Sequence, residues 1–156
     1  MKTLNEYKLL IEQWSIDRNL HTANPKAQFL KVVEEAGEIY EAIEFQEDNA
    51  LMDAIGDTYV TIVILAQQLN LELKKVHVPS ISLNDNNLFI ELSKTASGLS
   101  KDRDVSKHIN RVYSIVLELS LEYKMNFLDC VSVAYNEIKD RKGKMIDGTF
   151  VKADDL

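Results

Sequence analysis

Helical periodicity runs through almost the whole of this 156-residue sequence, and few residues interrupt it. Apolar residues recur three and four positions apart, so each segment can bury one stripe of a helix. The chain contains only five glycines and two prolines, the residues that most often break helices. We therefore predict an all-α helical bundle in a single domain, and no strand pattern is strong enough to predict a sheet. The predicted helices cover about residues 3–17, 25 to at least 43, 48–69, 87–99, 105–122 and 127–141, with a loop over 74–87.

Local signals mark where some of these helices begin. Asn24 followed by Pro25 suits a helix cap and the first helical position, and Asp48 and Asn49 can cap the next helix. That next helix is apolar on nearly every side after Asp57, which is typical of a helix in the interior of a protein. Beyond the last helix, glycines punctuate a polar tail that we expect to be extended or partly ordered.

Composition and charge exclude several functional classes. The net charge of −7 argues against a nucleic-acid-binding surface, which is normally basic. Cys130 is the only cysteine, so no disulfide forms within the chain and a reducing compartment is expected. The N-terminus lacks the apolar run of a signal peptide, and no apolar stretch approaches the ~20 residues of a membrane span. We therefore expect a cytoplasmic protein that does not associate with membranes.

The first of two acidic clusters lies on the second predicted helix. Glu34, Glu35 and Glu38 fall on one face of that helix, with Lys31 beside them and Gln28 at the edge. A solvated face opposite an apolar stripe of Phe29, Val33 and Tyr40 is the simpler interpretation of this helix alone.

The second cluster favours a functional interpretation of the first. Asp53 and Asp57 are one turn apart, and Asp57 points in a direction that becomes apolar within the next turn. A buried, unpaired carboxylate costs several kcal/mol, so Asp57 should be neutralised, paired or bound to a metal. If Glu35, Glu38 and Asp57 converged on Mg²⁺, the cation would compensate the negative charges of both helices. Gly37 and Gly56 would allow a backbone or a ligand to approach the acids, or would serve tight packing alone.

The acidic pattern resembles that of a known family. Gln28-x-x-Lys31-x-x-Glu34-Glu35-x-x-Glu38 followed by Asp57 is similar to the MazG-type all-α nucleotide pyrophosphohydrolases, which share a superfamily with the dimeric dUTPases. Trp14, Arg18 and the tail from Ala134 to Gly143 and Lys144 add to the resemblance. It covers about residues 11–71 and 128–151, and about 72–126 resemble an inserted helix pair without the acidic motif.

The resemblance implies a set of site residues. Glu35, Glu38 and Asp57 match the Mg²⁺ ligands, with Mn²⁺ as a possible substitute ion. The family's later Glu-x-x-Asp motif has Ala54 in the place of its glutamate, and Asp53 could replace that ligand. Glu34 would orient the attacking water with Lys31 in support. The residues that would bind the substrate are Gln28, Asn136, Lys139, Arg141 and Trp14. For each of the basic residues near the C-terminus, compensation of a helix end is an alternative role, and for Trp14 it is core packing.

The activity implied is hydrolysis of a nucleoside triphosphate between the α and β phosphates, in a homodimer or homotetramer. Two alternatives remain open at this point. One is a dUTPase- or dCTPase-like nucleotide diphosphatase, or an inactive relative. The other is a helical assembly module in which the acids only provide solubility.

A faint internal repeat links the acidic helices to the inserted pair. Phe29-Leu30 aligns with Phe89-Ile90, and Ile55 to Tyr59 aligns with Ile109 to Tyr113. In the second copy Arg111 stands at the position of Asp57, and the acids of the first helix are replaced. The pattern indicates either a duplicated helix pair or a chance match between two amphipathic pairs.

Overall fold

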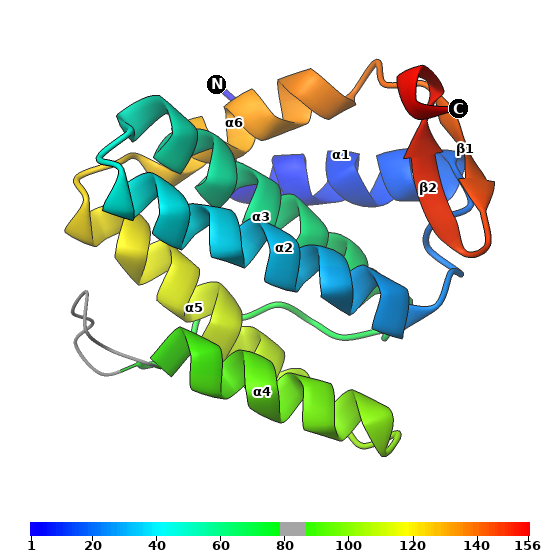
Figure 1. Cartoon of the computed structure of the whole chain (residues 1–156), viewed down its shortest axis with the longest axis horizontal. Helices are drawn as coiled ribbons and strands as arrows, with labels where there is room; N and C mark the ends of the chain where they lie inside the picture. Colours follow the sequence, from blue (N-terminus) through cyan, green and yellow to red (C-terminus); the bar gives the residue numbers. More distant parts are fainter. Residues whose placement is uncertain (79–86) are drawn as a thin grey trace.

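The computed structural model describes residues 1–78 and 87–156, and helices make up most of this part of the chain (Figure 1). The all-α class predicted from the sequence is confirmed. The part of the predicted loop that contains Pro79 and Asn84 lies outside the described residues. The helices are α1 (Leu4–Asp17), α2 (Pro25–Glu44), α3 (Asp48–Gln68), α4 (Asn87–Ser100), α5 (Ser106–Glu122) and α6 (Phe127–Ile138). They are followed by strands β1 (Gly143–Ile146) and β2 (Thr149–Lys152) and a short 3-10 helix, η1 (Ala153–Asp155).

Side-chain caps account for several helix starts. The side chain of Asn24 accepts a hydrogen bond from the backbone of Lys26, and Pro25 occupies the first turn of α2, as predicted. The prediction for α3 was wrong by one or two residues, because Asp48 already lies inside the helix and its N-cap is Glu47. Asp48 instead places a negative charge in the first turn, where the helix dipole favours it.

Helix α3 forms the centre of the fold. It contacts α1, α2, α5 and α6, and most of its residues are buried, as its apolar composition predicted. By length and hydropathy α3 is the one described helix that could cross a membrane, but 67% of its most apolar window is buried inside the protein. Its apolar surface is therefore accounted for by contacts with the surrounding helices (Figure 1).

Helix α2 buries part of its predicted apolar stripe, since Phe29 is buried as expected. Val32, Ala36 and Ile39 are buried against the bundle, whereas Val33 and Tyr40 are exposed. The prediction was wrong for Val33 and Tyr40, because α2 has apolar residues on two adjacent stripes and packing against α3 selects between them. The acidic face lies beside the buried stripe, and Glu35 therefore lies at the edge of the interface between α2 and α3.

Gly56 permits the close approach of α3 and α6. A Cβ atom at Gly56 would collide with the carbonyl oxygen of Cys130 and lie 2.9 Å from Cβ of Ala134. Gly37 has no neighbouring atom within 4 Å of the same position. Tight packing thus explains Gly56, one of the two roles left open by the sequence, and does not explain Gly37.

These two glycines provide a matched pair of substitutions. We expect Gly56→Ala to lower the free energy of unfolding by about 1–3 kcal/mol, because the added methyl group overpacks the α3–α6 contact. Gly37→Ala should raise it by up to about 1 kcal/mol, since alanine is the better residue in an open helix position. Urea unfolding of both variants measures the difference, and equal effects would contradict this account of Gly56.

The C-terminal tail is a β-hairpin, so the prediction that no sheet forms was wrong for this segment. Ile146 pairs with Thr149, which leaves Asp147 and Gly148 as a two-residue turn. Both turn residues have positive φ, at 49° and 81°, as the tight turns of hairpins require. An Asp-Gly pair between apolar residues is a strong hairpin signal in a sequence. The preceding helix also ends earlier than predicted, at Ile138 instead of about Arg141.

The inserted helices α4 and α5 pack against each other, and α5 also contacts α3. Burial follows the predicted repeat on α5, where Ile109 and Tyr113 are buried like Ile55 and Tyr59. On α4 it does not, because Phe29 is 7% exposed and Phe89 is 71% exposed. If the alignment of α4 with α2 is shifted by one residue, the buried positions of the two helices agree. The buried α4 residues Leu88, Glu91, Thr95 and Gly98 then correspond to Phe29, Val32, Ala36 and Ile39.

The second helix pair contains an ion cluster of its own. Glu91 is buried on α4 and accepts a hydrogen bond from Arg111 at 3.2 Å, and His108 lies 2.8 Å from its other oxygen. Arg111 stands at the repeat position of Asp57 and is paired within this cluster. The buried carboxylate of Glu91 is thus paired within the second helix pair.

Candidate active site

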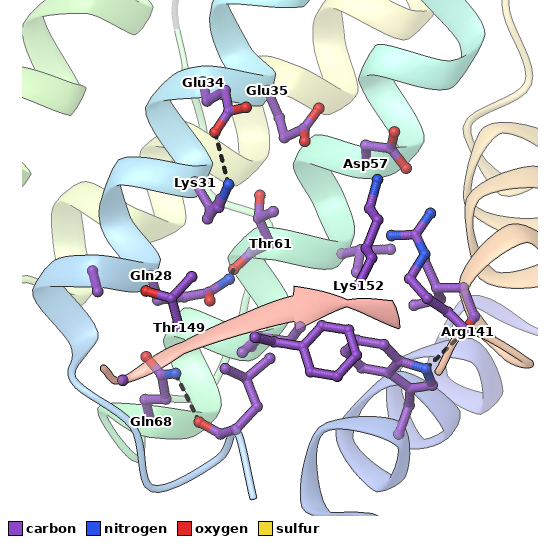
Figure 2. Close-up of a pocket in the computed structure, with 18 of the residues that line it drawn as sticks. Gln28, Lys31, Glu34, Glu35, Asp57, Thr61, Gln68, Arg141, Thr149 and Lys152 are labelled. Carbon is purple, nitrogen blue, oxygen red and sulfur yellow. Dashed lines mark hydrogen bonds and ion pairs between the residues drawn. The ribbon is translucent and has the colours of Figure 1, made fainter. Parts of the chain in front are cut away.

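One pocket of about 230 Å³ gathers most of the predicted site residues. It lies between α2, α3 and the C-terminal hairpin, with α1 and the end of α6 completing the wall (Figure 2). Seven of the predicted residues line it: Trp14, Gln28, Lys31, Glu34, Glu35, Asp57 and Arg141. The other lining residues are Leu20, Asn24, Ala27, Val60, Thr61, Ile64, Gln68, Ile138, Gly148, Thr149, Phe150 and Lys152.

Glu35 occupies the acidic end of the pocket. Burial raises the pKa of its carboxyl to about 7, and the negative charges of Asp57 and Glu38 add to the effect. One oxygen of Glu35, Oε2, is buried without a hydrogen-bond partner among the described residues. A buried acceptor without a partner destabilises the folded protein unless a hydrogen-bond donor or a cation binds it. Glu35 is therefore destabilised as a free carboxylate.

Asp57 faces Glu35 from α3 and has a similar environment. Burial raises the pKa of Asp57 to about 6, the charges of Glu137 and Asp53 add to this, and Arg141 opposes it. Glu137, on α6, was not among the predicted site residues. Its sequence signal is weak, because an acid on the outer face of a terminal helix is usually a solvated residue. The negative charges that act on Asp57 thus come from three helices, because Glu38 on α2 also raises its pKa.

The acidic end suits a hard divalent cation in charge and in donor type. Its carboxylates carry raised pKa values, and the orphaned oxygen of Glu35 lacks a donor. The predicted cage is nevertheless not preassembled. Within residues 1–78 and 87–156, no three Asp, Glu, His or Cys side chains converge closely enough to hold a metal ion as they stand. Glu38 and Asp53 are exposed and do not line the pocket. Their negative charges still act on the pocket, because Glu38 raises the pKa of Glu35 and Asp53 raises the pKa of Asp57.

Three basic side chains surround the acids. Lys31 pairs with Glu34 at 3.1 Å on the exposed face of α2. Arg141 and Lys152 extend toward Asp57 from the other wall of the pocket (Figure 2). Lys152 was not predicted, because the hairpin that carries it was not. The acidic end is therefore bordered by cations that can contact an anionic ligand.

The opposite end of the pocket is apolar, with two fixed amides. Gln28 donates to the carbonyl of Thr61 at 3.1 Å, and Gln68 donates to the carbonyl of Leu20 at 2.9 Å. Because a carbonyl can only accept, these bonds set the orientation of both amides. Val60 and Ile64 supply apolar surface beside them.

Trp14 serves the structure of this wall. Its indole donates to the carbonyl of Ile138 at 2.8 Å, and the ring is only 7% exposed. The Arg18 guanidinium lies 4.3 Å from the ring centre, and the ring centres of Trp14 and Phe150 are 5.4 Å apart in a T-shaped arrangement. The core-packing role left open by the sequence thus accounts for the contacts of Trp14.

Two predicted substrate-binding residues are not brought to the pocket. Asn136 is exposed on α6, where its amide lies 3.5 Å from the hydroxyl of Ser132. Lys139 is exposed just beyond the end of that helix. Both lie away from the pocket, which Arg141, three residues after the end of α6, reaches.

No family model matches the sequence, and no solved structure matches it. The chain is 41% identical over 63 residues to an uncharacterized 18.2 kDa protein from the rep-hol intergenic region of Haemophilus phage HP1. The matched residues are 40% of this chain and 39% of the phage protein, so the chain spans about two fifths of that relative. The relative has no assigned activity, and the similarity leaves the function to be inferred from the pocket.

Proposed function

We propose that the protein is a Mg²⁺-dependent nucleoside triphosphate pyrophosphohydrolase, which converts a (deoxy)nucleoside triphosphate to the monophosphate and pyrophosphate. The observation that carries the proposal is the division of one pocket into two unlike ends. Partly buried carboxylates with raised pKa values, bordered by cations, form one end, and apolar side chains with oriented amides form the other. This arrangement matches a ligand with a metal-bound polyphosphate and a flat heterocycle. The resemblance of the acidic motif to the MazG-type enzymes supports the same activity.

The acidic end has the residues to hold the metal. Glu35 and Asp57 would bind it with Glu38, and Asp53 is the nearest carboxylate to the position where the family's motif has its second glutamate. A bound Mg²⁺ would neutralise the polyphosphate and polarise the phosphorus under attack. The orphaned oxygen of Glu35 and the raised pKa values of both acids are consistent with a cation completing their coordination.

The remaining residues would position the reactants. Glu34 is exposed at the rim of the pocket, where its carboxylate can accept a proton from the attacking water while Lys31 holds it in place. The water oxygen forms a new bond to phosphorus as the bond to the α–β bridging oxygen breaks. That oxygen leaves with pyrophosphate. Arg141 can contact two phosphate oxygens at once, which helps to align the chain of phosphates.

The products identify the reaction. We expect the purified protein with Mg²⁺ to release monophosphate and pyrophosphate in equal amounts from at least one of the eight common (deoxy)nucleoside triphosphates. Ion-exchange chromatography of the products measures this, and EDTA should abolish it. Release of a nucleoside diphosphate and inorganic phosphate would show that the enzyme cleaves between the β and γ phosphates, which would contradict the proposal. A strict preference for dUTP or dCTP would indicate the narrower diphosphatase-like activity. No turnover of any substrate would contradict the proposal.

A further inference from the structure

The C-terminal hairpin is closed at its base and contacts the helical bundle through Phe150. The backbone of Ala153 donates to the carbonyl of Lys142 at 2.8 Å, which ties the two ends of the hairpin together. Phe150 packs against Trp14 in a T-shaped arrangement. A Cβ atom at Gly143 would collide with the carbonyl oxygen of Val151, so glycine is required where the strands meet. Strand β2 is therefore a fixed wall of the pocket.

Lys152 ends this strand at the acidic end of the pocket. It lines the pocket together with Asp57, and its amine points toward Asp57 (Figure 2). Unlike Lys31, which pairs with Glu34, Lys152 has no ion-pair partner within 4.0 Å among the residues that the structure describes. It is an exposed cation on a flexible stem, held by its backbone above a group of carboxylates.

We propose that Lys152 is a phosphate-binding residue that couples metal binding to substrate binding. This inference rests on the proposed function of the same pocket. An ammonium beside the carboxylates opposes a second cation that arrives alone, because like charges repel. The ammonium favours binding of the same cation when the cation carries phosphate oxygens, because those oxygens accept hydrogen bonds from the amine. The hairpin thus makes the pocket select the metal–triphosphate complex over the free metal ion.

The proposal predicts effects of opposite sign in one variant. In Lys152→Gln, Mg²⁺ alone should bind about two- to fivefold more tightly, as expected for loss of one partly exposed charge. The magnesium complex of inorganic triphosphate should bind roughly tenfold more weakly, since a charged hydrogen bond to phosphate is lost. Lys144→Gln is the matched control, because Lys144 lies on β1 of the same hairpin and does not line the pocket.

Titration calorimetry with the two probes measures both constants, and fluorescence of Trp14, the only tryptophan, reports on the hairpin wall. Equal behaviour of the Lys152 and Lys144 variants would overturn the role of Lys152 while leaving the proposed function intact. A loss of affinity for both probes would also overturn it, because it would indicate a general disturbance of the pocket. If the unmodified protein binds neither probe, the proposed function itself fails and this inference fails with it.

Discussion

Replacing Glu35 by glutamine is expected to lower kcat/KM for pyrophosphate release by at least about 10²- to 10³-fold. Glu35 stands at the centre of the acidic end, with a charged neighbour on each side and an oxygen that lacks a donor. Glutamine has nearly the same shape, but it removes the negative charge that a divalent cation requires. Activity measured over a range of Mg²⁺ concentrations should show that added metal does not restore the rate.

Glu44→Gln provides the matched control for this experiment. Glu44 lies nine residues along α2 from Glu35, which places it on the opposite side of the helix, and it is exposed. The control should retain the full rate and the full stabilisation by Mg²⁺ in thermal unfolding. An active Glu35→Gln variant would show that this carboxylate does not hold the metal, and the catalytic proposal would have to be abandoned.

The metal-free protein should lose stability as the pH rises through neutrality. The pKa values of Glu35 and Asp57 are raised to about 7 and about 6, so the folded protein binds more protons than the unfolded chain between about pH 4 and 7. The free energy of unfolding therefore falls as these groups ionise and levels off above the folded pKa. Between pH 5.5 and 8 we expect a loss of about 1–2 kcal/mol from these two groups, after allowance for solvent screening.

Asp57→Asn separates this contribution from that of other acids. The variant should show a shallower decline with pH and should be more stable than the unmodified protein at pH 8 without metal. It should also lose the stabilisation that Mg²⁺ confers on the unmodified protein, since the metal binds deprotonated carboxylates. Urea unfolding in EDTA and in Mg²⁺ at pH 5.5 and 8 provides all four values. A pH profile identical to that of the unmodified protein would show that Asp57 ionises freely.

Much of the architecture could be predicted from the sequence because its causes are local. The cap at Asn24, the all-round apolar surface of α3 and the scarcity of glycine and proline each act within a few residues. The conflict around Asp57, an acid pointing toward apolar neighbours, is local in the same sense. The pairing of the two acidic helices around one pocket could therefore be anticipated, and α2 and α3 do bring Glu35 and Asp57 to it.

Other features depended on contacts between segments far apart in the chain. Helix α2 has two apolar stripes, and its packing against α3 buries one of them and leaves Val33 and Tyr40 exposed. The influence of Glu137 on Asp57 required the packing of α6 beside α3. The hairpin had a local signal in Asp147 and Gly148, but its place as a wall of the pocket came from the contact between Phe150 and Trp14.

The helices, their approximate ends and the acids at the edge of the interior helix could be predicted because they follow from periodicity and near-neighbour chemistry. The set of charges that share a pocket depends on how the helices and the hairpin pack together. The separation of Arg141 from Asn136 and Lys139, and the arrival of Lys152 above Asp57, depend on where α6 ends and how the hairpin folds back. Electrostatic interactions act across space, and residues 95 positions apart become neighbours only when the whole chain has packed.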